Sequence, residues 1–70
     1  MATIIHVRSR ATGWYLGDDD RWSLRRSSAR TFNSALEAEQ YCREQRLTEV
    51  ELVVHRQNQP PLVMQIKFGR

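Results

Sequence analysis

Hydrophobic and polar residues alternate in two stretches of the second half of the chain. In residues 49–56, the two predicted faces are Val50, Leu52 and Val54 on one side and Glu51, Val53 and His55 on the other. In residues 62–68, one predicted face consists of Leu62, Met64, Ile66 and Phe68, and the other consists of Val63, Gln65 and Lys67. Because successive side chains of a strand point to opposite faces, this period of two predicts two strands. Residues 57–61, which end in two prolines, form the loop between them.

The first part of the chain predicts three shorter strands. They cover residues 3–9, which are rich in β-branched side chains, residues 14–16 and residues about 21–26. Polar turns separate them at residues 11–13 and 17–20. In the third strand, Trp22 and Leu24 share one face, and Arg21, Ser23 and Arg25 share the other.

A helix follows, and its start is marked by the residues Ser34-Ala-Leu-Glu37. This spacing fits a capping box, in which the serine oxygen accepts from a backbone N–H and the glutamate reaches back. Ala38, Tyr41 and Cys42 then recur at helical spacing and should face the sheet. We expect the helix to end near Arg46, where positive charge suits its negative end.

The element order is therefore β-β-β-α-β-β, which predicts a single α+β domain over residues 1–70. Its antiparallel sheet has about five strands, and one helix packs on one face of the sheet. The other face must be solvated or covered by a partner. By parity, this second face carries mostly polar and basic side chains, namely His6, Arg8, Ser23, Arg25, Glu51, His55, Gln65 and Lys67.

Length and composition limit what can stabilise this domain. A 70-residue chain buries only about 60% of the surface that its unfolded form exposes, so its stability is marginal. The single Cys42 excludes an intrachain disulfide, which leaves self-association as a way to add stability. The sequence shows no secretory signal and no apolar run long enough to span a membrane. A free cysteine without these segments favours a cytoplasmic location.

Arginine dominates the positive charge, and it concentrates in the first half. The net charge is +3 and the sequence pI is about 9.8. Arginines contact phosphates and guanine edges, and aromatic rings stack on bases. The candidate nucleic-acid-binding residues are Arg8, Arg21, Trp22, Arg25 and Arg30. The alternative interpretation is a solvated sheet face with Trp22 in the core.

Other reactive side chains do not assemble into a site in the sequence. His6 and His55 are interpreted as two surface histidines, because no third metal ligand lies nearby. Cys42 lies on the apolar stripe of the helix and is interpreted as a small core residue. Residues 18–20 are a turn, since the glycine and the distal glutamate of a calcium loop are missing. We therefore predict no catalytic, cofactor-binding or metal-binding residues and no enzymatic activity.

Two family resemblances accompany these patterns. The stretch from Gly13 to Arg56 resembles a family of short bacterial proteins of unknown function, which share a strand-strand-helix-strand core. The matching residues are Phe32, Ser34, Glu37, Ala38, Val54, His55 and Arg56. The resemblance covers more than half of the chain, implies a bacterial protein of the same core fold, and leaves residues 62–68 as an added strand.

The second resemblance concerns Trp14 to Tyr41. This stretch resembles the three-stranded DNA-binding domains of the Apetala-two type and of the arm-binding region of phage integrases. Those domains place their sheet in the major groove, which implies DNA contacts here from Arg21, Trp22, Arg25 and Arg30. The chain departs from them at Asp18-Asp-Asp20, because phosphates would repel this hairpin tip.

The sequence thus leads to two alternative functions. The first is a small non-enzymatic interaction module that uses the polar sheet face or a sheet edge and binds a protein or a second copy of itself. The alternative is a DNA- or RNA-binding module that uses the arginine-rich third strand. Neither function involves a cofactor or a membrane.

Overall fold

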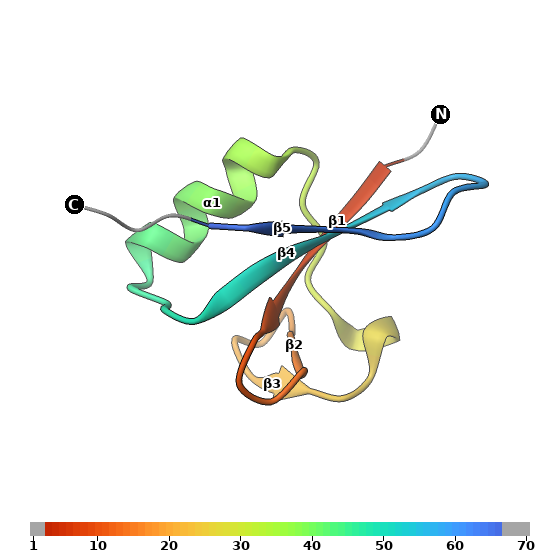
Figure 1. Cartoon of the computed structure of the whole chain (residues 1–70). Helices are drawn as coiled ribbons and strands as arrows, with labels where there is room; N and C mark the ends of the chain where they lie inside the picture. The colour runs from red at the N-terminus through yellow and green to blue at the C-terminus, as the bar shows by residue number, and fades with distance from the viewer. Residues whose placement is uncertain (1–2, 67–70) are drawn as a thin grey trace.

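Five antiparallel strands form one sheet in the order β3-β2-β1-β4-β5, with a single helix, as the computed structural model shows for residues 3–66 (Figure 1). In chain order the elements are β1 (Thr3–Ser9), β2 (Tyr15–Leu16), β3 (Trp22–Ser23), the 3₁₀ turn η1 (Arg26–Ser28), α1 (Ala35–Glu44), β4 (Val50–Arg56) and β5 (Leu62–Gln65). This confirms the predicted α+β fold and its order of elements.

The central pair of strands, β1 and β4, supplies half of the buried core cluster of the described residues. They pair over their whole length, from Thr3 opposite Arg56 to Ser9 opposite Val50. Directly opposite residues share a face, so the pattern of one strand reinforces that of the other. The helix packs on the apolar face, where the buried residues include Ile5, Val7, Leu52, Val54, Ala38 and Cys42.

The cap at the start of α1 is confirmed, with one difference in its hydrogen bonds. The Ser34 hydroxyl accepts a bond of 3.1 Å from the Glu37 N–H. The Glu37 carboxylate accepts from the N–H of Asn33 at 2.9 Å, one residue earlier than the capping box predicts. The helix itself ends at Glu44, before Arg46, which has a left-handed φ of 57°.

The third strand was predicted to be too long. The observed strand β3 covers only Trp22–Ser23, because the Ser23 hydroxyl accepts a hydrogen bond from the Arg25 N–H at 3.0 Å and turns the chain. The 3₁₀ turn η1 follows directly. Leu24 consequently does not share the packing of Trp22, and 71% of its surface is exposed.

Residues 29–32 form an unpredicted part of the sheet. Ile5 of β1 bridges to Phe32, and the Arg30 N–H donates to the carbonyl of Leu16 in β2 at 2.8 Å, so this extended segment contacts both strands. The Phe32 N–H donates to the Ile5 carbonyl at 2.9 Å. Ala29 and Phe32 are both buried as a result. The segment joins the β2–β3 hairpin to the helix and closes the core between them.

The last strand lies at the edge of the sheet and covers Leu62–Gln65. Of the other predicted strand positions, Ile66 follows the strand without belonging to it, and Lys67 and Phe68 lie outside the described residues. Ile66 is buried, but Leu62 and Met64 are 44% and 39% exposed. Five strands at a spacing of about 4.8 Å are wider than one helix of about 10 Å diameter, so the helix leaves this edge uncovered.

The buried face of β4 provides a test of this packing. Leu52→Ala should lower the free energy of unfolding by about 2–5 kcal/mol, because Leu52 is only 2% exposed and its loss leaves a cavity. Leu36→Ala is the matched control, since Leu36 is 62% exposed and its loss should cost within about 0.5 kcal/mol. Urea unfolding of both variants measures the difference. Equal costs would contradict the assigned core.

Candidate functional site

Two histidines lie against each other on the sheet face opposite α1. His6 of β1 and His55 of β4 have ring centroids 5.0 Å apart, and Tyr15 of β2 meets His6 edge-on at 5.6 Å. His6 is 6% exposed and Val53 is 2% exposed, so the centre of this face is buried by the chain's own side chains. The expectation of a surface histidine was wrong for His6, because the three-dimensional arrangement brings Tyr15 over its ring, whereas His55 is half-buried.

The ring nitrogens of this pair are incompletely satisfied. Nδ1 of His6 and Nε2 of His55 are buried and have no hydrogen-bond partner among the described residues. Burial lowers the pKa of His6, and the charges of His55 and Arg26 lower it further. Burial, Arg26 and Arg8 likewise lower the pKa of His55. Both rings are therefore mainly neutral at pH 7, which suits their burial but leaves no positive charge for a phosphate.

A hydrogen-bonded network continues this face across three strands. Arg8 Nε donates to Glu51 Oε2 at 2.7 Å, and Gln65 Nε2 donates to Glu51 Oε1 at 3.2 Å. Arg10 reaches Gln65 Oε1 at 3.3 Å. Burial opposes ionisation of Glu51, but the bonds from Arg8 and Gln65 outweigh it and lower the pKa of this carboxyl. Arg8 is therefore engaged within the fold.

The residues predicted to bind nucleic acid do not gather on one surface. Trp22 pairs with buried Leu16 and packs half-buried against the core. Arg30 bonds to Asp20, and Arg8 bonds to Glu51. Arg21 and Arg25 are exposed, and their guanidinium groups have no ion pair within residues 3–66. The exposed cations of this region are thus Arg21, Arg25 and, in η1, Arg26.

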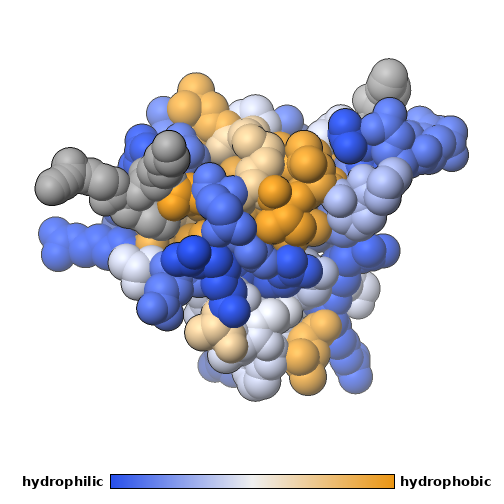
Figure 2. Space-filling model, viewed as in Figure 1, coloured by the Kyte–Doolittle hydropathy of each residue, from blue (hydrophilic) through white to orange (hydrophobic). Residues whose placement is uncertain are grey.

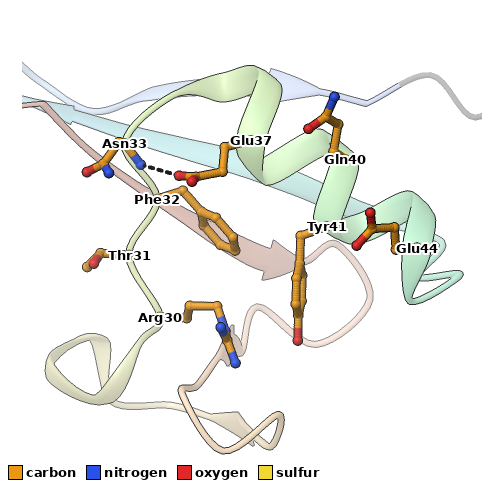
Figure 3. A pocket seen from close by; sticks show the side chains of 8 residues that line it. All are labelled: Arg30, Thr31, Phe32, Asn33, Glu37, Gln40, Tyr41 and Glu44. Atoms are coloured by element: carbon orange, nitrogen blue, oxygen red, sulfur yellow. Dashed lines mark hydrogen bonds between the residues drawn. The ribbon is translucent and has the colours of Figure 1, made fainter.

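Sequence reasoning missed a cluster that joins the hairpin tip to the helix. Asp20 accepts hydrogen bonds from Arg30 at 3.3 Å and from the Tyr41 hydroxyl, and the Arg30 guanidinium lies 4.8 Å from the centre of the Tyr41 ring. Figure 3 shows Arg30 and Tyr41 pointing the same way beside Phe32. The hydrogen bond to Asp20 raises the pKa of Tyr41, and burial adds to this effect. No local sequence pattern reveals this cluster, because Asp20 and Tyr41 are 21 positions apart.

An open groove of about 370 Å³ adjoins this cluster. It is lined by Arg30, Thr31, Phe32, Asn33, Glu37, Gln40, Tyr41 and Glu44 (Figure 3). The Glu37 carboxylate already accepts a hydrogen bond from the backbone N–H of Asn33. Acidic and basic groups both face the groove, and the arginine is already paired with Asp20. The groove therefore carries no concentrated charge of either sign.

A second exposed feature is the free edge of the sheet at β5. All of Leu62–Gln65 is exposed, and three of these residues are large and apolar: Leu62, Val63 and Met64. In Figure 2, the apolar colour gathers over β5 and the neighbouring helix, with hydrophilic residues around it. An edge strand usually carries charges that prevent pairing with other chains. None of the four residues of β5 is charged.

The state of Cys42 and the arrangement of the possible metal ligands bear on catalysis and metal binding. Cys42 is fully buried, and burial raises the pKa of its thiol to about 11, with Glu39 adding to the shift. The thiol is therefore protonated at neutral pH and makes a poor nucleophile. Residues 3–66 contain no cluster of three or more His, Cys, Asp or Glu side chains placed to hold a metal ion. Nor does any helix there have the length and apolar character to cross a membrane.

Buried His6 and half-buried His55 make stability depend on pH. Their folded pKa values lie below the ordinary 6.5, so their contribution is complete above pH 6.5 and is lost as the pH falls through the folded values. The melting temperature should therefore fall between pH 7 and pH 5. The variant His6→Gln/His55→Gln, which has no histidine, should lose this dependence.

Proton NMR titration of the two rings in the unaltered protein measures the same effect without a substitution. Both rings should titrate below 6.5. Ring pKa values at or above 6.5 would contradict the buried pair.

Comparisons with protein-family models, with curated proteins and with solved structures gave no match to this chain. The two family resemblances therefore stay predictions from the sequence, and the geometry of the described residues carries the functional argument.

Proposed function

We propose that this protein is a small, non-enzymatic protein-interaction module that binds an extended strand of its partner at the edge of β5. One observation carries the proposal: β5 is an exposed edge strand with three large apolar side chains and no charge. Such an edge presents unpaired backbone groups, and a partner strand that pairs with them continues the sheet.

The hydrogen-bond pattern indicates which backbone groups of β5 face outward. The Ile5 carbonyl bonds to Phe32, on the side of β1 away from β4. Because N–H and C=O directions alternate along a strand, the neighbouring His6 bonds to β4, at its opposite residue Val53. The Arg10 N–H, which donates to the Glu49 carbonyl, follows the same alternation.

The same alternation carries through β4 to the edge. Since Val53 bonds to β1, Leu52 bonds to β5, where it faces Met64. Val63 and Gln65 therefore direct their N–H and C=O groups away from the sheet. Beyond them, Pro61 has a carbonyl but no N–H on the same side. The binding edge is thus defined by Val63 and Gln65.

The edge is a better candidate than the polar face of the sheet. The centre of that face is filled by His6, Glu51 and Val53, which are at most 9% exposed. Its arginine Arg8 already bonds to Glu51. A partner at the β5 edge displaces none of these contacts, whereas a partner on the face would have to replace them.

A short labelled peptide of alternating threonine and valine tests the edge directly. Its binding should shift the backbone NMR signals of Val63 and Gln65 more than those of β1. Val63→Pro should abolish binding, because it removes an outward N–H and leaves the bonds to β4 intact. Val63→Thr keeps the N–H and is the control. Binding that survives in Val63→Pro, or shifts centred on another element, would contradict the proposal.

The alternative function, DNA or RNA binding, is supported by the exposed arginines Arg21, Arg25 and Arg26 around η1. Arg30 and Arg8 contribute less, because Asp20 and Glu51 already pair with them. The acidic turn Asp18-Asp-Asp20 lies next to these arginines in the chain and opposes a phosphate backbone. We therefore rank this function second.

A titration of labelled duplex DNA at low salt and at about 0.15 M salt separates the two functions. We expect weak binding that disappears at the higher salt and weakens equally in two variants of equal charge. They are Arg21→Gln/Arg25→Gln/Arg26→Gln and the control Arg43→Gln/Arg46→Gln/Arg56→Gln. A true DNA interface would keep its affinity at the higher salt and lose about 2–3 units of salt slope only in the first variant.

A further inference from the structure

The β5 edge also indicates which partner it fits. We infer that its partner is a second copy of this chain, and that two β5 strands pair in antiparallel fashion across a two-fold axis at Met64. This inference rests on the proposed function and specifies its partner. The resulting sheet would run without interruption from one copy into the other.

A two-fold pairing is constrained by the faces of the two strands. If the helices lie on the same face of the joined sheet, opposite residues of the two strands must share that face. With the axis at Met64, Val63 lies opposite Gln65 of the second copy, and Gln65 lies opposite Val63 of the second copy. Every outward N–H of one edge then meets an outward C=O of the other.

The neighbouring register is less favourable because of the prolines. With the axis at Val63, Gln65 would lie opposite Pro61 of the second copy. Pro61 has no N–H to donate, so the outward carbonyl of Gln65 would stay without a partner. An unpaired group in a closed interface costs about 1–3 kcal/mol, which favours the axis at Met64.

The side chains agree with this register. Met64 would lie opposite Met64 of the second copy, and Leu62 would lie opposite Ile66, all on the same side of the sheet as α1. Leu62 and Met64 are 44% and 39% exposed in the single chain, so the pairing would remove apolar surface from water. On the other face, Val63 would lie beside Gln65 of the second copy.

Charge and size favour a copy of the same chain over an unrelated strand. Residues 62–66 carry no charge, and the cation bonded to them at this edge is Arg10, on the Gln65 side chain, while each chain is +3 overall. Salt should therefore strengthen this association slightly by screening, whereas it weakens binding to a nucleic acid. A chain of 70 residues buries a smaller fraction of its surface than a larger domain does, so the apolar area buried on pairing adds more to its stability.

Light scattering over a dilution series tests the association. The unaltered protein should reach twice the 8.3 kDa mass of the chain at high concentration and dissociate on dilution. Val63→Pro and Met64→Lys should stay monomeric and keep the far-ultraviolet circular dichroism of the folded chain. Val63→Thr should dimerise like the unaltered protein.

Disulfide trapping tests the register. In the pairing proposed, the two Met64 residues form a non-hydrogen-bonded pair, with Cα atoms about 4.5 Å apart, a distance that a disulfide can span. Met64→Cys should therefore cross-link on oxidation. Leu62→Cys should not, because the two Leu62 residues are separated by four positions along the strands, or about 14 Å. The unaltered protein controls for Cys42, which is fully buried.

The outcomes separate the two proposals. A monomer at every concentration would overturn the second copy as partner, and binding of the alternating peptide would then leave the proposed function standing. A dimer that persists in Val63→Pro, or a cross-link through Leu62→Cys but not Met64→Cys, would overturn the interface or its register. A monomer that also fails to bind the peptide would overturn both.

Discussion

The antiparallel ladder between β1 and β4 is the interaction on which the rest of the structure depends. It joins strands that are more than forty residues apart in the chain, and it pairs every residue of β1, from Thr3 to Ser9. Through this ladder Ile5, Val7, Val50, Leu52 and Val54 fall on one face, which the helix covers. The position of α1, the order of the remaining strands and the free edge at β5 all follow.

The two faces of this ladder solve the problem of burial differently. On one face, Ala38 and Cys42 of the helix pack on aliphatic side chains. On the other, no second layer is present among the described elements, and polar residues bury one another. His6 lies under Tyr15, and Glu51 is held by Arg8 and Gln65. A single helix thus covers one face of the central strands, and the chain's own side chains bury the centre of the other.

Because one helix covers only the centre of the sheet, the edge strand β5 is left exposed. At the other side, the outermost strand β3 has only two residues, residues 29–32 bridge to β1, and Asp20 ties the hairpin to Tyr41. At the β5 side, an uncharged strand has outward backbone groups and exposed apolar side chains. The asymmetry between the two sides is the physical basis for the proposal that the interaction surface lies at β5.

The sequence by itself determined the features that depend on local spacing. The period of two in residues 49–56 and the cap at Ser34 depend on near neighbours, so the element order, the helix start and the faces of β1 and β4 could be predicted. The length of β3 could not, because the Ser23 hydroxyl competes with the strand. Only the tertiary structure decided that His6 and Glu51 are buried, that Asp20 meets Tyr41, and that β5 is an edge. These features depend on which distant segments meet, since burial and pairing are properties of the assembled chain.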